Sequence, residues 1–546
     1  MASNIHKSSG SNNTSLNVIL AIVFISLVSI IIIIRIRMLA APLERDEGEY
    51  AYTGQLMLEG VPPYSFAYNM KMPGIYAAYA VILAIFGQTQ SGIHFAVLLI
   101  NTATIILIFL LTKKFFGSIA GAAAGVFFAI TSASNMTEAT ANAENFVVIF
   151  ALAGIYLLTN FTDSKKTLNL IFGAFLLGIA FMMKQHGAAF ILFGLFFVVF
   201  KEIRNKPIKL KKLATVISIY SFFAVLPFLI TCLILLYCGV FEKFWFWTFE
   251  YARHYVSLLP FSDGFSNLKK SLAMIVSPSV LIWLFAFAGL LSVIWNREIR
   301  KHGVFIVAFS ICSFLAVCPG LYFRPHYFVL FLPALSILAG TGIIAIRELF
   351  AHRIKSAVKT DLISILVILV VWLQCFYSHR YYFTESDPEL ISRYNFGFVP
   401  FPESLKIANF IKANSNKDDK IAVFGSEPQI YFYAHRRSAT SFIYTYPLME
   451  IQPFALEMQK EMIKQIEDNK PKFMIVVKIP NSWLPLPESE KLIFDWVIEY
   501  LPAHYRQVGL VEMASEESGT VYRWDAFAKP SKPEGWIMIF ERINQD

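Results

Sequence analysis

Long apolar runs are the feature of this sequence that most constrains its fold. A helix needs about 20 apolar residues to cross a hydrocarbon core about 30 Å thick. Runs of this character, several of them short, lie near residues 17–37, 91–112, 118–133, 146–161, 168–182, 188–200, 213–238, 272–295, 303–319, 327–346 and 361–377. Because 56% of the residues are hydrophobic and only 16% are charged, we expect a polytopic α-helical membrane protein with about eleven spans.

The loops between these runs alternate in charge, and this alternation predicts their orientation. The basic loops contain Lys113-Lys114, Lys165-Lys166 and the clusters at 201–212, 297–301 and 347–359. Basic loops favour the cytoplasmic side of a membrane. This places the tail at 1–16 in the cytoplasm and the region from Ser378 on the outer side. The net charge of +9 therefore reports orientation and does not predict a nucleic-acid partner.

The apolar segment from Met72 to Phe86 does not fit this alternation, because a span there would reverse the side of every later basic loop. We expect it to be a juxtamembrane helix on the outer face, within the first external loop. Pro73 suits the first turn of such a helix.

The last part of the chain has a different pattern. Residues 404–412 and 456–466 show helical periodicity, whereas 420–424, 472–477 and 507–511 are typical of short buried strands. Strands separated by helices indicate a small α/β domain. We therefore predict a cytoplasmic tail (1–16), a transmembrane core (17–377) and an extracytoplasmic α/β domain (378–546). The five cysteines all lie in or beside apolar segments, so no disulfide framework is expected.

An acidic stretch follows the first apolar run and is the strongest candidate for a working site. Asp46, Glu47 and Glu49 lie within one turn, and Lys71 follows about 25 residues later after an aromatic and Pro-rich segment. A carboxylate at bilayer depth costs several kcal/mol, about 2.5–3.5 on insertion scales. Acids at this boundary are therefore either a solvated flank of the helix or a functional site. The presence of Lys71 about 25 residues later favours a functional site.

Other polar residues are predicted to lie on the same side of the membrane. They are Glu144 at the start of a span, Lys184 and His186 at the end of another, Arg253 and His254 in an aromatic stretch, and Arg324 and His326 between two later spans. Each also has a structural explanation, because cationic and aromatic side chains commonly anchor at membrane interfaces. Together they form a set of acids and bases that we expect to converge on one outer pocket.

These residue types suit a transfer reaction with a phosphate leaving group. A carboxylate can take the proton of an attacking hydroxyl, and Lys or Arg can stabilise the charge that develops on phosphate. His186, Glu144, Asp46 and His326 come from separate loops, so they give only a weak signal for a divalent metal, and no other cofactor is indicated. No Gly-rich phosphate loop is present, which argues against a nucleotide-dependent enzyme built on one.

Several motifs resemble the GT-C glycosyltransferases. They are Arg45-Asp46-Glu47-Gly48-Glu49-Tyr50, Gly60-Val-Pro-Pro-Tyr64, Lys71-Met72-Pro73, Ala143-Glu144-Asn145-Phe146, the segments at 324–335 and 423–431, and Arg436-Arg437-Ser438-Ala439-Thr440. The branch is the bacterial glycosyltransferase family 39, which is related to protein O-mannosyltransferases and lipid A aminoarabinose transferases. The resemblance covers nearly the whole chain, and the Asp-Glu pair with Lys-x-Pro is its most specific part.

The resemblance implies an inverting transfer of a sugar from a polyprenyl-phosphate-linked donor to a lipid, glycan or protein outside a bacterial plasma membrane. It makes Asp46 the catalytic base and Glu47 its supporting neighbour. It makes Lys71 a ligand of the donor phosphate and Glu144 the second acidic position. Arg253, His254, Arg324 and His326 become candidate phosphate contacts, with weaker support from spacing.

Two departures from the family pattern bear on which sugar is transferred. The aminoarabinose branch has a basic residue where Gly48 and Glu49 follow Asp-Glu, and Met72-Pro73-Gly74 replaces its Pro-Pro, which argues against that particular sugar.

Two other functions are alternatives to the glycosyltransferase. A transporter or flippase of a lipid-linked or polar substrate is one alternative, although it usually has repeated halves. An O-antigen-type ligase or polymerase is the other, although such enzymes generally centre on a late external loop.

Overall fold

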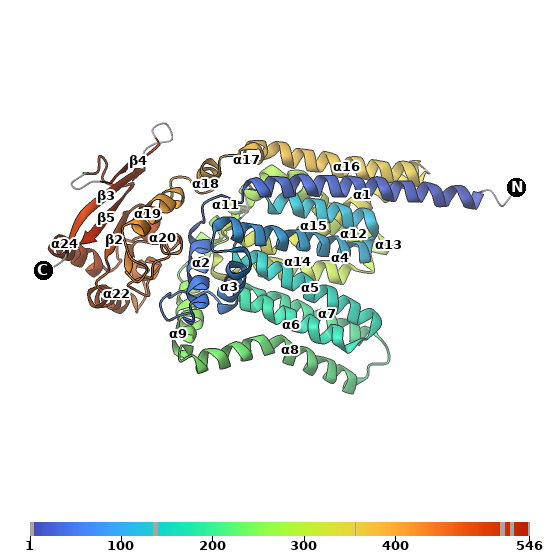
Figure 1. The fold of residues 1–546 in the computed structure, drawn as a ribbon. Helices are drawn as coiled ribbons and strands as arrows, with labels where there is room; N and C mark the ends of the chain where they lie inside the picture. Colours follow the sequence, from blue (N-terminus) through green and yellow to red (C-terminus); the bar gives the residue numbers. More distant parts are fainter. Residues whose placement is uncertain (1–4, 135–139, 355, 514–518, 525–528, 544–546) are drawn as a thin grey trace. The chain divides into compact units, whose positions relative to one another are not determined.

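The computed structural model describes residues 5–134, 140–354, 356–513, 519–524 and 529–543, and the chain packs as two compact units (Figure 1). Unit 1 comprises Met1–Leu39, His94–Thr231 and Leu259–Ser386, and unit 2 comprises Ala40–Ile93, Cys232–Leu258 and Asp387–Asp546. The sequence boundary after residue 377 stays a prediction. The packing, however, joins residues 40–93 and 232–258 to the C-terminal region rather than to the helical core.

Apolar helices form unit 1, and the predicted polytopic helical fold is confirmed. Eight helices among the described residues are long and apolar enough to cross a membrane, and three apolar helices are shorter. The predicted number of about eleven spans stays a prediction. The principal helices are α1 (Ile5–Arg37), α4 (Gln90–Ser132), α5 (Ala143–Ser164), α6 (Thr167–Met183), α7 (Ala188–Arg204), α8 (Leu210–Tyr237), α11 (Phe261–Val276), α12 (Val280–Trp295), α14 (Gly303–Leu315), α15 (Leu332–Ile354) and α16 (Ala357–Ser378).

The long element α4 is a helical hairpin rather than one straight rod. Gly117 has φ 86° and ψ 174°, a backbone conformation that glycine adopts without a Cβ clash. A Cβ on Gly121 would lie 2.8 Å from the carbonyl oxygen of Phe109, so the chain folds back on itself at Gly117. This hairpin accounts for the two separate apolar runs in this part of the sequence.

Glycines allow the helices of unit 1 to approach closely. At the crossing of α12 and α15, a Cβ on Gly289 would lie 2.0 Å from the oxygen of Leu338, and one on Gly342 would lie 2.0 Å from the oxygen of Phe285. Gly154 and Gly173 play the same part between α5 and α6. Small residues are the usual solution in membranes, where close backbone packing rather than water exclusion drives helix association.

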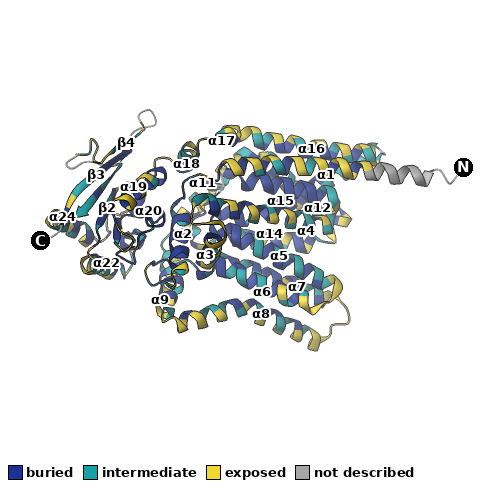
Figure 2. Cartoon of the chain, in the orientation of Figure 1, coloured by how far each residue is buried: buried dark blue, intermediate teal, exposed yellow. Residues whose placement is uncertain are grey.

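The outward faces of these helices are apolar, as expected for contact with lipid. In Figure 2 exposed and buried residues alternate along α1, α8 and α16, so that each of these helices has an exposed side, whereas α15 is largely buried. The exposed side of α8 carries large hydrophobic residues, namely Phe222, Leu229, Leu233 and Leu236. An apolar surface on this scale is typical of a membrane protein.

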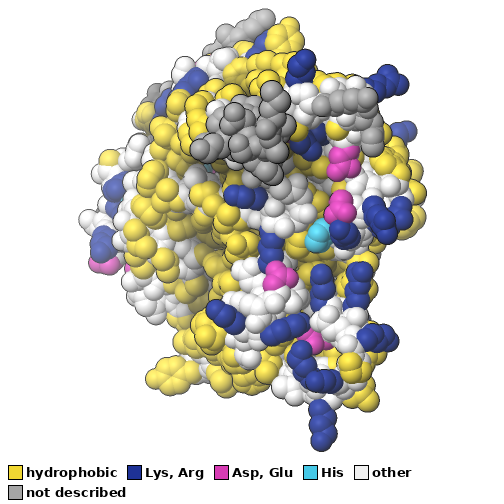
Figure 3. Space-filling model, turned by 90° about the vertical axis from the view of Figure 1, so that its right-hand side faces the viewer, with side chains coloured by type: hydrophobic (Ala, Val, Ile, Leu, Met, Phe, Trp, Pro, Cys, Tyr) yellow, Lys and Arg dark blue, Asp and Glu magenta, His cyan; other side chains and the backbone are white. Residues whose placement is uncertain are grey.

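Three of the basic loops meet at one end of unit 1, where ion pairs join them. Lys114 pairs with Asp163 at 2.7 Å, and Glu202 pairs with both Lys165 at 2.5 Å and Lys212 at 2.7 Å. Figure 3 shows that Lys and Arg predominate over acidic side chains on this end. The grouping agrees with loops that share one side of a membrane. Which side that is stays a prediction.

Unit 2 contains a five-stranded mixed sheet in the order β1-β2-β5-β3-β4. The strands are β1 (Ile421–Phe424), β2 (Phe473–Lys478), β3 (Tyr505–Met513), β4 (Thr520–Arg523) and β5 (Trp536–Arg542). β1 and β2 are parallel, and β5 pairs antiparallel with β2 and β3. The predicted α/β domain is confirmed. The helices around it are α18 (Pro388–Phe396), α19 (Phe401–Ala413), α20 (Gln429–Ala434), α21 (Tyr446–Met449), α22 (Ala455–Asn469), α23 (Pro480–Trp483) and α24 (Leu492–His504).

The first loop contributes two helices to unit 2, α2 (Arg45–Leu58) and α3 (Pro73–Phe86). They pack tightly, because a Cβ on Gly54 would lie 2.9 Å from the backbone nitrogen of Ala80. α3 begins at Pro73, as predicted, with proline in its first turn. Residues 232–258 add α9 (Phe241–Trp245), the π-helix η3 (Phe246–Tyr251) and α10 (Ala252–Ser257).

The close crossing of α12 and α15 predicts that Gly289→Val destabilises unit 1. The added methyl groups would meet a backbone oxygen, which cannot move aside as a side chain can. Such overpacking typically costs about 1–3 kcal/mol, so we expect a lower thermal unfolding midpoint in detergent. Leu290→Val, on the more exposed adjacent position, is the matched control. Equal midpoints for the two variants would contradict the close crossing.

Candidate functional site

The N-terminus of α2 presents the acidic stretch in an ordered form. Glu44 is the N-cap, and its side chain accepts hydrogen bonds from the backbone N–H groups of Asp46 and Glu47. In return, the Glu47 carboxylate accepts a hydrogen bond of 2.9 Å from the N–H of Glu44. This reciprocal capping box satisfies N–H groups that a helix otherwise leaves unpaired. Glu47 is fully buried, so its visible role is to fix the backbone on which Asp46 stands.

Asp46 accepts a hydrogen bond on each of its carboxylate oxygens. Lys71 donates to Oδ2 at 2.8 Å, as the sequence pairing led us to expect. Tyr444, from the C-terminal region, donates its hydroxyl to Oδ1 at 2.7 Å. The side chains of Lys71 and Asp46 are only 16% and 18% exposed. Because charge-assisted hydrogen bonds are the stronger class, this arrangement holds the carboxylate in one orientation.

The position of Lys71 is itself fixed by tyrosines. The hydroxyl of Tyr64 donates to the backbone oxygen of Lys71 at 2.6 Å, and the Lys71 ammonium lies 5.5 Å from the centroid of the Tyr50 ring. Tyr64 comes from the Gly60–Tyr64 motif, and Tyr50 stands one turn after Asp46. The motifs that were noted separately in the sequence therefore build one site around Lys71.

Glu49 is a second carboxyl group in this site, and it is completely buried. Its oxygens accept hydrogen bonds from the Tyr76 hydroxyl at 2.5 Å and from the Asn69 amide at 2.7 Å. Burial raises the pKa of Glu49 to about 8, an effect that Lys71 opposes and the negative charge of Asp46 reinforces. Glu49 is therefore mostly protonated near neutral pH, although the sequence alone suggested one more charged acid.

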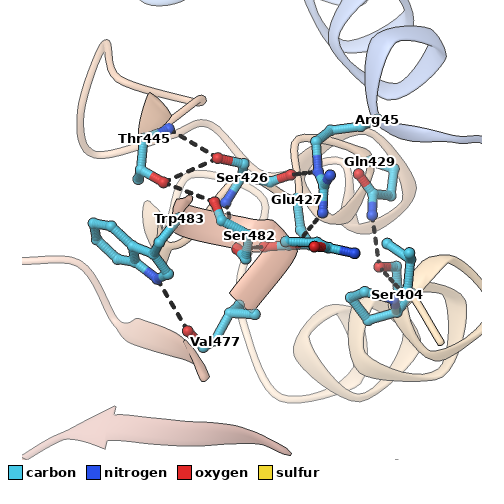
Figure 4. Close-up of polar contacts among 12 residues, drawn as sticks. Arg45, Ser404, Ser426, Glu427, Gln429, Thr445, Val477, Ser482 and Trp483 are labelled. Carbon is cyan, nitrogen blue, oxygen red and sulfur yellow. Dashed lines mark hydrogen bonds and ion pairs between the residues drawn. The ribbon is translucent and has the colours of Figure 1, made fainter. Parts of the chain in front are cut away.

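α2 is docked onto the C-terminal part of unit 2 by an ion pair and by a close backbone contact. Arg45 pairs with Glu427 at 2.9 Å, and the Glu427 side chain is fully buried (Figure 4). Gly48 faces α20, where a Cβ on Gly48 would lie 2.6 Å from the backbone nitrogen of Gln429. Any larger residue at position 48 would push α2 away. This explains in physical terms the glycine between the acids of the motif.

Unit 1 holds a separate polar cluster around Glu144. Lys184 donates to Glu144 at 2.5 Å, and the side chains are 10% and 1% exposed, respectively. The same ammonium lies 4.2 Å from the centroid of the Tyr327 ring, a distance typical of a cation–π contact. The sequence also allowed Lys184 to be an interfacial anchor, but the structure gives it a buried acidic partner.

The two histidines of unit 1 border this cluster. The rings of His186 and His326 contact that of Tyr327 at centroid distances of 5.2 and 4.8 Å. Nδ1 of His186 lies 2.6 Å from the backbone oxygen of Ala316. His326 is buried, whereas Arg324 is exposed and its guanidinium lies 5.7 Å from the Tyr322 ring. The predicted residues Glu144 and His326 therefore belong to one neighbourhood.

Arg253 and His254 lie on α10 in unit 2. Arg253 is exposed, and the His254 ring packs edge-on against Phe454 at 5.5 Å. The structure thus brings Asp46, Glu47 and Lys71 together in unit 2, and Glu144 with His326 in unit 1. The predicted meeting of Asp46 with Glu144 stays a prediction.

Among the described residues, no group of three or more His, Cys, Asp or Glu side chains is arranged to hold a metal ion.

The fold can now be compared with known structures. The chain matches ArnT from Cupriavidus metallidurans bound to undecaprenyl phosphate, with a TM-score of 0.59, 15% identity, and coverage of 96% of this chain and 98% of that one. The apo state of that ArnT matches with a TM-score of 0.57 and 16% identity, over 89% of this chain and 95% of that one. This chain has the GT-C fold.

Another solved structure and two family models also match this chain. The archaeal oligosaccharyltransferase AglB from Archaeoglobus fulgidus, in complex with an inhibitory peptide and a dolichol-phosphate, matches with a TM-score of 0.50 and 12% identity, over 95% of this chain and 76% of that one. Residues 70–231 match the family of dolichyl-phosphate-mannose-protein mannosyltransferases. Residues 402–491 match the C-terminal domain of the putative competence-induced protein Ccs4. No curated protein sequence matches the chain.

Sequence reasoning did not find Tyr444. It stands 398 positions from Asp46, in a segment without a recognisable motif, and only the fold brings the two together. The nearby motif at 423–431 was noted, and it gave a signal that this part of the C-terminal region matters. Glu49 was seen as an acid, but its burial against Tyr76 and Asn69 could not be read from the sequence.

The buried Glu49 predicts a specific pH dependence of stability. Its pKa is about 8 in the folded protein and near 4.3 in an unfolded chain. Between these values the folded state holds the proton and the unfolded state has lost it. The free energy of unfolding should therefore fall as pH rises from about 5 to about 8, by at most about 1.4 kcal/mol per pH unit.

Thermal unfolding across this pH range, compared between wild type and Glu49→Gln, measures the effect. The variant should lose this part of the slope, because glutamine has no proton to release. Glu457→Gln, at an exposed acid on α22, should keep the wild-type slope. Parallel curves for wild type and Glu49→Gln would show that Glu49 is already ionised in the folded protein.

Proposed function

We propose that this protein is an integral-membrane glycosyltransferase that transfers a sugar from a polyprenyl-phosphate-linked donor to an acceptor on the outer side of a bacterial plasma membrane. The observation that carries the proposal is the Asp46–Lys71 pair at the start of α2 in a chain with the GT-C fold. The pair supplies a base for an acceptor hydroxyl and a cation for a phosphate. The family match over residues 70–231 supports the same reaction class.

In this reaction the acceptor oxygen attacks the anomeric carbon of the donor sugar from the side opposite the phosphate. The new C–O bond forms as the bond to the phosphate oxygen breaks, and the configuration at the anomeric carbon is inverted. Asp46 takes the proton of the acceptor hydroxyl, and the polyprenyl phosphate leaves with the bonding electrons. Lys71 stabilises the negative charge that grows on the departing phosphate.

The Asp46–Lys71 contact makes these two roles dependent on each other. The ammonium of Lys71 lies 2.8 Å from Asp46, and while it does so it stabilises the carboxylate and weakens it as a base. A donor phosphate that binds Lys71 draws this ammonium away from Asp46. Asp46 therefore gains proton affinity at the point when the donor is in place, and it is a poorer base before then.

The remaining candidate residues have supporting roles in the proposal. Glu47 holds the backbone of Asp46 through the capping box. Arg324 and His326 of unit 1, and Arg253 and His254 of unit 2, are proposed phosphate contacts. Glu144 is the second acidic position, with Lys184 as its partner. The acceptor is a lipid, a glycan or a protein, and membrane lipids surround the helical unit.

Asp46→Asn tests the proposal in membranes that carry the protein, supplied with radiolabelled polyprenyl-phosphate sugars. Loss of a general base typically lowers a rate by about 10²- to 10⁴-fold, so we expect transfer to fall near background. Glu457→Gln, an exposed carboxyl change in the same unit, should transfer at the wild-type rate. Wild-type transfer by Asp46→Asn, with normal insertion and unfolding midpoint, would contradict the proposal.

Lys71→Met tests the phosphate role. Removing one stabilising donor from a developing charge typically lowers a rate by about 10²- to 10³-fold. We also expect the variant to bind undecaprenyl phosphate more weakly, as measured by the ligand-induced rise in unfolding temperature. Exposed Lys460 on α22 offers a matched control in Lys460→Met. If Lys71→Met keeps both the rate and the shift, another residue holds the phosphate.

A further inference from the structure

The contact between Tyr444 and Asp46 ties the C-terminal region to the carboxylate that we propose as the base. Tyr444 is in the segment between α20 and α21, and its hydroxyl lies 2.7 Å from Oδ1 of Asp46. Both residues belong to unit 2. The tyrosine occupies one carboxylate oxygen, and Lys71 occupies the other. The two donors therefore reach Asp46 from parts of the chain that are distant in sequence.

A hydrogen-bond network fixes the immediate neighbours of both partners. Beside Asp46, Arg45 pairs with Glu427 and donates from Nε to the backbone oxygen of Ser426 at 2.5 Å. Beside Tyr444, the backbone N–H of Thr445 donates to the Ser426 hydroxyl at 3.0 Å. Figure 4 shows that these contacts converge at the end of β1.

Ser482 closes this network, which we call the Glu427 network (Arg45, Ser426, Glu427, Thr445 and Ser482). Its hydroxyl donates to Glu427 at 2.7 Å, and its backbone oxygen accepts a hydrogen bond from the Thr445 hydroxyl at 3.0 Å. Ser426, Glu427, Thr445 and Ser482 are all buried. Because buried networks that are well satisfied are rigid, the distance between Asp46 and Tyr444 is set by the domain and not by a mobile loop.

Tyr444 is suited to remain a donor. Burial raises its pKa well above the ordinary value for tyrosine, and the negative charges of Asp46 and Glu44 raise it further, while Arg45 opposes them. The phenol therefore keeps its proton near neutral pH. In the hydrogen bond between them, the Tyr444 hydroxyl is therefore the donor and the Asp46 carboxylate is the acceptor.

We propose that Tyr444 is a positioning residue for the transfer reaction, because it holds Oδ1 of Asp46 and leaves Oδ2 as the atom that accepts the proton of the acceptor hydroxyl. This inference rests on the proposed function. When a donor phosphate draws Lys71 away from Oδ2, the bond from Tyr444 to Oδ1 remains. The carboxylate then keeps its orientation through the step in which it acts, and the C-terminal region is a part of the active site.

Tyr444→Phe tests the inference in the full-length protein, with a readout that needs no donor. Infrared difference spectra of the carboxyl band are recorded during a pH titration, and the Asp46 band is isolated by subtraction of Asp46→Asn. Loss of a hydrogen bond to the charged form disfavours that form, so the midpoint of the Asp46 titration should move up by about one pH unit. Tyr505→Phe, which removes a buried hydroxyl bound to the Pro471 oxygen, should leave it in place.

A second variant covers the case in which Tyr444→Phe does not fold. A ring-fluorinated tyrosine at position 444 keeps the hydroxyl and makes it a stronger donor, so the Asp46 midpoint should move down instead of up. A midpoint equal to wild type in a variant that folds would overturn the inference. With an active donor assay, Tyr444→Phe should lower kcat about tenfold and move the acidic limb of the rate profile upward, with KM little changed.

The two proposals fail in different ways. Wild-type transfer by Asp46→Asn would remove the proposed function, whatever the infrared midpoint of Asp46 does. Normal transfer and an unchanged acidic limb in Tyr444→Phe, with Asp46→Asn inactive, would leave the function in place and overturn only the role of Tyr444.

Discussion

Pairing of buried charges is the constraint on which this structure depends. A charge at low dielectric constant is costly unless an opposite charge and hydrogen bonds accompany it. The chain meets this requirement at Asp46 with Lys71, at Glu427 with Arg45 and at Glu144 with Lys184. Buried pairs of this kind add little net stability to a protein. Removing one partner is nevertheless strongly destabilising, because the other charge is then buried without a partner. Their main effect here is to fix where the polar groups stand.

The Glu427–Arg45 pair has the widest consequence, because it joins the first loop to the C-terminal region as one packing unit. α2 carries Asp46, and it is held against α20 by the absence of a side chain at Gly48. Tyr444 then reaches Asp46 from the far end of the chain. A region that could be a simple cap on the helices is therefore part of the site.

Hydropathy predicted the helical unit well, because a span leaves a run of apolar residues that few other structures need. The start of α3 at Pro73 and the strands β1, β2 and β3 were also predictable, since their signals are local. β4 and β5 were missed. β4 is only four residues long and half exposed. β5 pairs antiparallel with β2, and an alternation of strands and helices in the sequence does not predict an antiparallel strand. The contacts of Tyr64 and Tyr50 with Lys71, and the hydrogen bond from Tyr444 to Asp46, are tertiary contacts. No local sequence pattern could have predicted them.

In the proposed reaction, Lys71 leaves Asp46 for the phosphate of the lipid donor while Tyr444 stays. An experimental structure of the full-length protein with undecaprenyl phosphate in lipid nanodiscs would test this movement. We expect phosphate density within hydrogen-bonding distance of the Lys71 ammonium, a longer Lys71–Asp46 distance, and an unchanged contact from Tyr444 to Oδ1. Phosphate bound away from Lys71, with the Asp46–Lys71 pair intact, would contradict it.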